Sequence, residues 1–311
     1  MSSHQEFFTL SNGNKIPAIA IVGTGTRWYK QEETADNFSK ELVDQLKYAL
    51  TLPGTVHLDA AEVYRTYPEF SEALKQTSKS RDEIFITDKY STQLKVTKDP
   101  IEGLETSLKR NNLEYVDLYL LHSPFISKEK NGFTLEEAWQ QMEQLYKEGK
   151  AKNIGVSNFS VDDLQKLMAT AKILPQVNQI EHNAFLLNQT PGIVNFCQDH
   201  KILVEAYSPL GPFQKKSEAN AEFYEYIKSL AEKYGKTEAQ VLLRWVTDNG
   251  ILPVTTSSKK ERIENAQNLF TFDLTKEEVE KITELGRKNK AQRLYWNSEY
   301  DKFNAFSQSK N

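Results

Sequence analysis

The sequence predicts an α/β protein folded as a closed (β/α)8 TIM-type barrel, with an N-terminal β-hairpin before the barrel and an extra helix and tail after it. Two observations predict this fold. Short apolar runs alternate with longer amphipathic stretches eight times along the chain. The apolar runs are nearly continuous, with little alternation between apolar and polar residues, which is typical of parallel strands buried on both faces. Eight such units favour a closed barrel over an open sheet.

Each unit consists of a strand-like run and the helix-like stretch that follows it. In chain order the units are Ala18 to Gly23 with Glu32 to Leu50, Val56 to Ala60 with Glu69 to Lys79, Ile84 to Lys89 with Pro100 to Asn111, Val116 to His122 with Leu135 to Lys147, Asn153 to Ser157 with Val161 to Thr170, Val177 to Glu181 with Pro191 to His200, Ile202 to Tyr207 with Ala221 to Tyr234, and Ile251 to Thr256 with Lys259 to Phe270. The carboxyl ends of all eight strands should therefore meet on one face.

Two segments lie outside this repeat. Phe7 to Ile19 places Asn12 and Gly13 between short apolar runs, a hairpin signal, and this hairpin can close the bottom of the barrel. Lys276 to Arg287 predicts an extra helix, and the tail after it carries Tyr295, Trp296, Tyr300, Phe303 and Phe306. Such an aromatic tail either caps an apolar pocket or packs on the barrel wall.

Length and composition favour one enzyme-sized domain that acts on small molecules. A barrel of 311 residues commonly folds around one core, and no linker rich in proline, glycine or serine divides the chain, so residues 1 to 311 are expected to form a single domain. The formal net charge is −4, with acidic and basic residues interspersed. This pattern argues against nucleic acid and anionic membranes as partners.

Cysteine usage and the N-terminus predict a cytoplasmic protein. The one cysteine, Cys197, excludes a disulfide within the chain and suits a reducing compartment. The first residues lack the basic and apolar regions of a signal peptide, and no apolar stretch approaches the length of a membrane span.

Four polar residues stand where the second, third and fourth predicted strands end. Asp59 and Tyr64 follow the second strand, Lys89 closes the third, and His122 closes the fourth. If these strands are parallel neighbours, the four side chains converge on one face.

The four residue types together form a proton-donating site. A tyrosine hydroxyl with its ordinary pKa of about 10 protonates a substrate poorly at neutral pH unless a cation stabilises the phenolate. Lys89 can supply that cation, and Asp59 can hold the ammonium by a charge-assisted hydrogen bond. His122 adds a donor or acceptor that orients a carbonyl oxygen. Tyr64 is therefore the expected general acid.

Each residue has an ordinary structural explanation when it is taken alone. Asp59 can cap a helix, Tyr64 can be a packed aromatic, Lys89 can be solvated, and His122 can be a core histidine with its hydrogen bonds satisfied. Only their joint placement after consecutive strands favours a catalytic site.

This set can protonate an alkoxide but cannot supply electrons, so a redox cofactor is expected. The usual dinucleotide fingerprint is absent, because Gly23 to Trp28 begins like G-x-G-x-x-G but ends in tryptophan and opens no immediate helix. Amide and hydroxyl groups follow later strands instead. Ser157, Asn158 and Gln179 can bond a carboxamide, and Tyr207 can stack on a flat heteroaromatic ring.

The segment after the eighth strand has the composition of a phosphate site. Thr256 to Arg262 places hydroxyls, lysines and an arginine at the start of a helix, where an anion is favoured. The alternative is an ordinary capped and solvated helix start.

Taken together, these motifs resemble the aldo-keto reductase family. The resemblance runs from Phe7 to about Leu294. The matching stretches are Leu58 to Tyr64, Ile86 to Lys89, Leu120 to Pro124, Gly155 to Phe159, Tyr207 to Gly211 and Glu261 to Ile263.

The resemblance implies a (β/α)8 barrel that transfers hydride from NADPH to a carbonyl carbon, with Tyr64 protonating the oxygen, Lys89 and Asp59 tuning it, and His122 orienting the substrate. It implies a small carbonyl substrate, either an aldehyde or an activated ketone such as an alpha-keto amide or alpha-keto ester, and a monomer. The cofactor-binding residues it implies are Gly25, Thr26, Ser157, Asn158, Gln179, Tyr207, Ser208, Leu210, Thr256, Ser257, Lys259 and Arg262. The pocket candidates are Trp28, Tyr90, Phe125, Tyr295 and Trp296, an aromatic set that favours uncharged carbonyls.

The sequence departs from the family pattern at several places, and two of them alter the expected pocket and phosphate site. The tryptophan that often follows the catalytic histidine is Ser123. The common Ile-Pro-Lys-Ser near the adenosine phosphate is replaced by Leu252 to Ser257, which has no lysine. The preference for NADPH is therefore expected to depend on Arg262 and Lys259.

Two other functions remain open at this point. A barrel of this family can act as a sensor of the nicotinamide cofactor or as a structural protein with little turnover, although the complete catalytic set argues against this. A metal-dependent hydrolase ranks last, because the five histidines are scattered and His-Glu-x-x-His is absent, so no metal site is expected.

Overall fold

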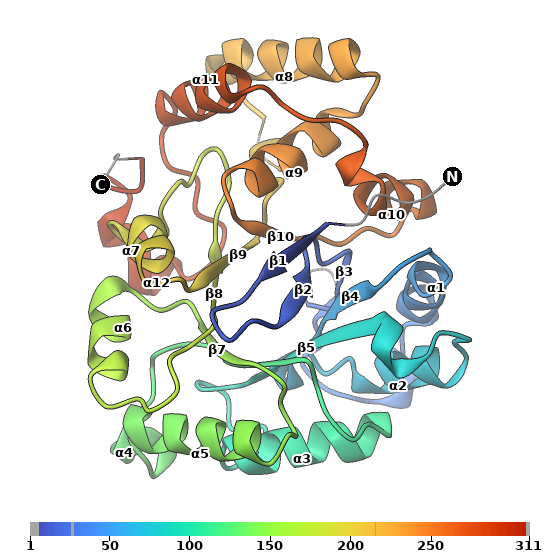
Figure 1. Ribbon diagram of the computed structural model, residues 1–311, viewed down its shortest axis with the longest axis vertical. Helices are drawn as coiled ribbons and strands as arrows, with labels where there is room; N and C mark the ends of the chain where they lie inside the picture. The colour runs from blue at the N-terminus through green and yellow to red at the C-terminus, as the bar shows by residue number, and fades with distance from the viewer. Residues whose placement is uncertain (1–5, 26–27, 215, 309–311) are drawn as a thin grey trace.

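Eight parallel strands form a barrel in a computed structural model that describes residues 6–25, 28–214 and 216–308 (Figure 1). The strands are hydrogen-bonded in sequence order from β3 to β10. A parallel bridge between Ala20 and Val254 joins the first strand segment to the last and closes the sheet. The strands are β3 Val22–Gly23, β4 Val56–Asp59, β5 Ile84–Tyr90, β6 Leu118–Leu121, β7 Ile154–Ser157, β8 Val177–Glu181, β9 Leu203–Tyr207 and β10 Leu252–Val254. The predicted barrel is confirmed.

The N-terminal hairpin closes one end of this barrel. Strands β1 Phe7–Thr9 and β2 Lys15–Pro17 pair antiparallel, and the hairpin crosses the barrel in the view of Figure 1. Its buried Ile16 belongs to an apolar cluster with Phe85, Leu118 and Val177, which lie near the amino ends of their strands. The hairpin therefore packs at the end opposite to the carboxyl ends, as predicted.

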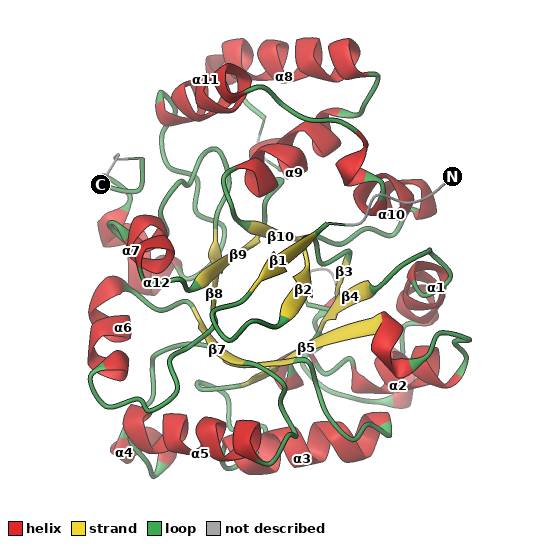
Figure 2. Ribbon diagram, viewed as in Figure 1, coloured by secondary structure: helices red, strands yellow, loops and turns green. Residues whose placement is uncertain are grey.

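Helices surround the strands and cover their outer faces (Figure 2). Those that follow barrel strands are α1 Lys40–Ala49, α2 Tyr67–Lys75, α3 Pro100–Asn111, α5 Leu135–Lys147, α6 Val161–Met168, α7 Ile193–Asp199, α9 Glu238–Asp248 and α10 Lys260–Gln267. Helix α5 illustrates how the sequence specifies them, because Thr134 and Glu137 form a capping box and Trp139 and Met142 belong to its buried face. Two single-turn helices, α4 Lys128–Asn131 and α12 Asn297–Tyr300, were not expected.

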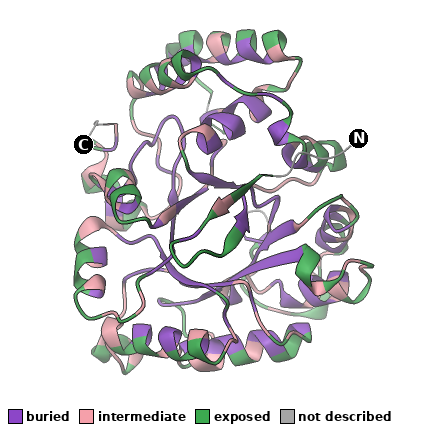
Figure 3. Cartoon of the chain, in the orientation of Figure 1, coloured by how far each residue is buried: buried purple, intermediate pink, exposed green. Residues whose placement is uncertain are grey.

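The helix predicted for the seventh unit is confirmed, but a second helix that was not predicted, α9, follows it. Helix α8, Ala221–Tyr234, does form, but it lies in an outer layer with α11 Lys276–Arg287, while α9 packs between this layer and the barrel (Figure 1). Helix α9 is buried from Gln240 to Thr247, including the polar side chains of Gln240, Arg244 and Thr247. Figure 3 shows this contrast between the buried α9 and the half-exposed α8. Both helices are amphipathic, so their patterns alone do not show which of the two packs on the barrel.

Two predicted helix boundaries also move. The stretch from Glu32 yields a helix only from Lys40, because the Ser39 side chain caps it by accepting from the Leu42 amide. The stretch from Glu69 to Lys79 is helical from Tyr67 to Lys75, with Pro68 in its first turn. None of the helices in the described part of the chain is long and apolar enough to cross a membrane.

Candidate active site

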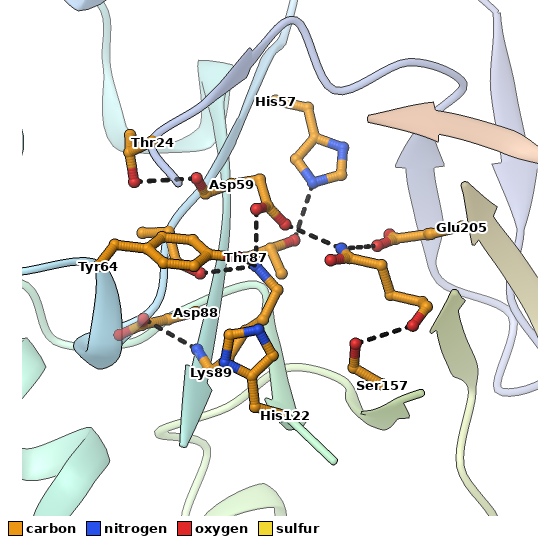
Figure 4. Close-up of polar contacts among 12 residues, drawn as sticks. Thr24, His57, Asp59, Tyr64, Thr87, Asp88, Lys89, His122, Ser157 and Glu205 are labelled. Atoms are coloured by element: carbon orange, nitrogen blue, oxygen red, sulfur yellow. Dashed lines mark hydrogen bonds and ion pairs between the residues drawn. The ribbon is translucent and has the colours of Figure 1, made fainter. Parts of the chain in front are cut away.

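The structure brings Asp59, Tyr64, Lys89 and His122 together at the carboxyl ends of neighbouring strands (Figure 4). Asp59 ends β4 and pairs in register with Thr87 of β5. Lys89 lies two residues beyond Thr87, so it points to the same face of the sheet. His122 follows the last residue of β6, and Tyr64 ends the 3-10 turn η3, Glu62–Tyr64, in the connection after β4.

Lys89 is the centre of this group. Its ammonium is fully buried, and Nζ donates to Asp59 Oδ1 at 2.6 Å and to the carbonyl of Ala60 at 2.8 Å. The Tyr64 hydroxyl lies 3.5 Å from the same Nζ. Burial by itself lowers the pKa of Lys89, but the charges of Asp59 and Tyr64 outweigh it and hold the pKa above its ordinary value. Lys89 is therefore a cation at neutral pH.

Tyr64 and His122 are both neutral at physiological pH. Burial raises the pKa of Tyr64 to about 12, against the lowering effect of Lys89. The expected influence of the lysine is thus present but smaller than the effect of desolvation. Burial and Lys89 lower the pKa of His122 to about 3, and its ring meets the Tyr64 ring edge-on with centroids 5.6 Å apart. Tyr64 can donate its proton, and His122 can offer an N–H to an oxygen without carrying charge.

The position of the Tyr64 ring requires glycine at position 25. A Cβ atom on Gly25 would lie 2.6 Å from Cζ of Tyr64 and 2.8 Å from both Cε atoms. The neighbouring loop is held by the amide of Thr24, which donates to the Asp59 carbonyl at 2.8 Å. Gly25 thus lets the loop after β3 approach the Tyr64 ring closely. Thr26, the other predicted cofactor contact in this loop, lies outside the described residues.

A cavity of about 760 Å³ opens beside these side chains. Asp59, Tyr64 and His122 are part of its wall. The predicted cofactor and pocket residues that also line it are Gly25, Asn158, Gln179, Tyr207, Ser208, Leu210, Thr256, Tyr295 and Trp296. A volume of this size accommodates a substrate together with part of a larger cofactor.

Hydrogen bonds fix the amide side chains predicted to bind the cofactor. Asn158 Nδ2 donates to the His122 carbonyl at 2.9 Å, and the Tyr207 hydroxyl donates to Asn158 Oδ1 at 2.8 Å. Gln179 Nε2 donates to Asp59 Oδ2 at 2.9 Å. Ser157 lies behind the cavity wall, since its hydroxyl donates to the Gln179 backbone carbonyl at 2.8 Å. The amides therefore form a rigid wall that is coupled directly to the proton-donating group.

Left-handed backbone conformations cluster around this cavity. Asn158, Ser208 and Trp296 line it with φ angles of 62°, 53° and 56°, and Arg65, directly after Tyr64, has a φ of 56°. Such a conformation costs a non-glycine residue on the order of 1 kcal/mol or more, and residues that adopt it tend to cluster at functional sites. The backbone around the cavity is thus held in position by its tertiary surroundings.

The residues predicted to bind phosphate lie at the start of α10. Thr256 lines the cavity and accepts from Trp28 Nε1 at 3.4 Å. Ser257 Oγ accepts from the amide of Lys259, which is the residue preceding α10, at 3.1 Å. Arg262 follows in the first turn, with its surface exposed. These last three residues are beyond the cavity wall, at a helix N-terminus that favours an anion.

The tail forms the opposite wall of the cavity. Glu181, at the end of β8, accepts from the backbone amides of Leu294 at 2.8 Å and Tyr295 at 3.2 Å. The Tyr300 hydroxyl donates to the Asn158 carbonyl at 2.5 Å. Of the two arrangements that the sequence left open, the tail therefore lines the pocket with Tyr295 and packs against the barrel with Tyr300.

Three predicted pocket residues lie elsewhere. Trp28 is buried in the main core, and Tyr90 is buried with its hydroxyl donating to the Lys98 carbonyl at 3.3 Å. Phe125 packs behind the wall, 5.7 Å from the ring of Trp296. The wall residues that the sequence did not suggest include Tyr29, Val63, Gln93, Asn297, Ser298 and Glu299. These six lie in loops, in η3 and in the short α12, where no periodic pattern reveals which side chains face inward.

Within the described ranges, no group of three histidine, cysteine, aspartate or glutamate side chains is arranged to hold a metal ion. The donor set fits a nicotinamide dinucleotide better, because an aromatic ring and amide groups line the cavity and a basic helix N-terminus lies beyond its wall. Charge and shape thus match a cofactor with a flat ring at one end and phosphate at the other.

Comparisons with known proteins place these features in a family. The model of the Aldo/keto reductase family matches residues 21–287. An NADPH-dependent alpha-keto amide reductase of Saccharomyces cerevisiae is 65% identical over 310 residues, which is 99% of each chain. An NAD/NADP-dependent indole-3-acetaldehyde reductase of Schizosaccharomyces pombe is 39% identical over 88% of this chain and 93% of its own. The crystal structure of a Bombyx mori aldo-keto reductase in complex with NADP has a TM-score of 0.78 at 31% identity, covering 95% of this chain and 97% of its own.

Proposed function

This chain belongs to the aldo/keto reductase family, and from that premise we propose that it is an NADPH-dependent carbonyl reductase in which Tyr64 is the general acid. The observation that carries the role of Tyr64 is its hydroxyl, which lies 3.5 Å from the buried ammonium of Lys89 on the wall of the cavity. No other described tyrosine combines a position on this wall with contact to a buried cation.

In this proposal, different side chains of the site bind the carbonyl oxygen, protonate it and stabilise the resulting charge. His122 and Tyr64 face the cavity and can donate hydrogen bonds to one oxygen, which fixes its position. NADPH, when bound, supplies the hydride to the carbonyl carbon. As charge grows on the oxygen, Tyr64 transfers its proton, and Lys89 stabilises the phenolate that results. Asp59 keeps Lys89 charged through the 2.6 Å ion pair.

The residues that would hold the cofactor follow the cavity from the strand ends to α10. The Tyr207 ring would stack on the nicotinamide, beside the amides of Asn158 and Gln179. Ser257, Lys259 and Arg262 would face the 2′-phosphate. The NADPH-dependent reductase that is 65% identical supports this choice of cofactor.

We propose activated ketones, and alpha-keto amides in particular, as substrates. The name of the relative that is 65% identical supports this class. The aromatic rings of Tyr29, Tyr295 and Trp296 on the wall suit an uncharged substrate, while Gln93 offers an amide beside them. The sensor function is less well supported, because the acid and the orienting histidine line the cavity and the cation lies directly behind the acid.

We also propose that the protein is a cytoplasmic monomer. The buried free thiol of Cys197 is compatible with a reducing compartment. Light scattering of the purified protein tests the monomer, and a dimer mass at micromolar concentration would contradict it. Microscopy of a fluorescent fusion tests the compartment, and signal within an organelle would contradict that assignment.

The test of the proposed function is an assay of absorbance at 340 nm with NADPH or NADH and a panel of aldehydes, alpha-keto amides, alpha-keto esters and simple ketones. We expect turnover with NADPH, and the fastest turnover with the activated ketones. Binding of NADPH without turnover of any carbonyl would contradict the proposal and favour the sensor function.

A further inference from the structure

A second carboxyl group lies inside the barrel close to the proton-donating residues. Glu205 stands in the middle of β9 and is fully buried. Its register partners are Gln179 on β8 and Leu252 on β10. Figure 4 shows its side chain directed toward Asp59 and Lys89 from the opposite side of the barrel. Neither the mechanism proposed above nor the sequence motifs assign a role to this glutamate.

Gln179 connects Glu205 to the ion pair. Its Nε2 donates to Glu205 Oε2 at 2.7 Å and to Asp59 Oδ2 at 2.9 Å, so both of its hydrogens are engaged. Asp59 in turn accepts from Lys89 through its other oxygen at 2.6 Å. A continuous chain of hydrogen bonds therefore runs from Glu205 through Gln179 and Asp59 to Lys89. Any rotation of the Gln179 amide would break the bond to Asp59 as well as the bond to Glu205.

The surroundings of Glu205 favour its neutral form. The Oε1 atom is buried and has no hydrogen-bond partner, and an ionised oxygen in that position would be costly. Burial and the charge of Asp59 raise the pKa of Glu205 to about 8, although Gln179 and Lys89 act in the opposite direction. The nearby imidazoles add no charge, because burial and Lys89 lower the pKa values of His57 and His122 to about 3. With Glu205 neutral, Asp59 and Lys89 balance each other.

We propose that Glu205 is a positioning residue which, as a neutral carboxylic acid, holds Gln179 against Asp59 and leaves the charge of Lys89 available to Tyr64. When Glu205 gives its proton to solvent, the site gains a negative charge. This charge competes with the phenolate of Tyr64 for Lys89, so Tyr64 becomes a weaker acid. The inference rests on the proposed role of Tyr64 as general acid.

The test is the pH dependence of kcat for Glu205→Gln, with saturating NADPH and ketone. Glutamine keeps an oxygen that accepts from Gln179 but cannot ionise, so it imitates the neutral acid. We expect wild-type kcat to fall by about tenfold from pH 7 to pH 9.5. The variant should match the wild type at pH 7 and lose this alkaline decrease. The same decrease in both proteins, or a variant that is nearly inactive at pH 7, would overturn the proposal.

A second variant covers the case in which Glu205→Gln folds poorly. Glu205→Leu removes the ionisable group and the acceptor while keeping an apolar side chain of similar size in the barrel. It should have a kcat about tenfold below that of the wild type, because Gln179 loses its partner, and it should also lack the alkaline decrease. Retention of the decrease in the leucine variant would overturn the proposal equally.

Glu143→Gln is the matched control. Glu143 is a buried glutamate on α5 whose Oε1 accepts from the amides of Lys172 and Ile173, outside the barrel. Its variant should retain the alkaline decrease of the wild type. Tyr64→Phe, measured in parallel, separates the two proposals. Near-normal turnover in that variant would overturn the role of Tyr64 as general acid. A pH profile in the Glu205 variants equal to that of the wild type would overturn only the role of Glu205.

Discussion

Lys89 and Asp59 form an ion pair of 2.6 Å inside the barrel, with side-chain exposures of 0% and 4%. A buried charge without a partner costs several kcal/mol, so each of these residues is tolerated largely because the other is present. Replacement of the pair by neutral groups would cost little stability. Stability therefore does not account for the charge of Lys89, whereas its contact with the hydroxyl of Tyr64 does.

We expect a single substitution in this ion pair to destabilise the protein and a second substitution, at the partner, to restore most of the stability. Lys89→Met should lower the free energy of unfolding by about 3 to 5 kcal/mol, because it leaves Asp59 buried and unpaired. Adding Asp59→Asn should restore most of that loss, whereas reductase activity should stay absent in both variants. Denaturant unfolding and the NADPH assay give the two readouts. A double variant as unstable as Lys89→Met would contradict this account of the pair.

Tyr64→Phe should leave NADPH binding nearly unchanged and reduce kcat by orders of magnitude, because only the proton donor is removed. The ring remains, so its edge-on contact with His122 is retained. Fluorescence titration with NADPH and steady-state kinetics distinguish binding from turnover. A kcat close to that of the wild type would exclude Tyr64 as the general acid.

Gly25→Ala should lower kcat by about tenfold or more, because the added methyl group would lie 2.6 Å from Cζ of Tyr64 and displace the ring. Gly23→Ala is the comparison, since a Cβ there meets the Thr255 carbonyl oxygen at an ordinary 3.6 Å. Steady-state kinetics on both variants provide the measurement. Equal effects of the two alanines would show that the contact with Tyr64 is not the cause.

Arg262→Ala should weaken the binding of NADPH more than that of NADH, since only the former has a 2′-phosphate to pair with the guanidinium. Arg262 is exposed in the first turn of α10, so the substitution should leave the fold intact. Dissociation constants for both cofactors at two salt concentrations test this. Similar losses for the two cofactors would mean that Arg262 does not contact the phosphate.

The stability of the wild type relative to Glu205→Gln should depend on pH. The pKa of Glu205 is raised from 4.5 to about 8 in the folded protein, so folding favours its protonated form. This contribution is complete below pH 4.5 and is lost as the pH rises to about 8, at about 1.4 kcal/mol per pH unit. Unfolding of both proteins between pH 4.5 and 9 measures the difference. A constant difference across this range would contradict a protonated Glu205.

Local patterns in the sequence determined the barrel and brought out the four residues that we propose as the proton-donating site. The apolar runs at Val56 to Ala60 and Ile84 to Lys89 are strands of the parallel sheet, and strand period and parallel order bring their carboxyl ends together. The sequence alone therefore predicted that Asp59 and Lys89 lie near each other. The hairpin from Phe7 followed in the same way from its Asn12-Gly13 turn.

Tertiary structure alone decided which layer each helix occupies and which side chains face the cavity. Helix α9 packs against β10, whereas α8 packs against α9 and α11, and because both helices are amphipathic their sequences do not show which one lies on the barrel. Trp28 packs in the core while Tyr29 lines the cavity, because contacts with distant segments, rather than a repeating pattern, determine the conformation of this loop. The link between Glu205 and the site is a hydrogen bond from Gln179 on the adjacent strand. The raised pKa of Tyr64 results mainly from its burial within the barrel. Hydrogen bonds and desolvation of this kind depend on residues far apart in the chain, whereas strand and helix periods depend on neighbours in sequence.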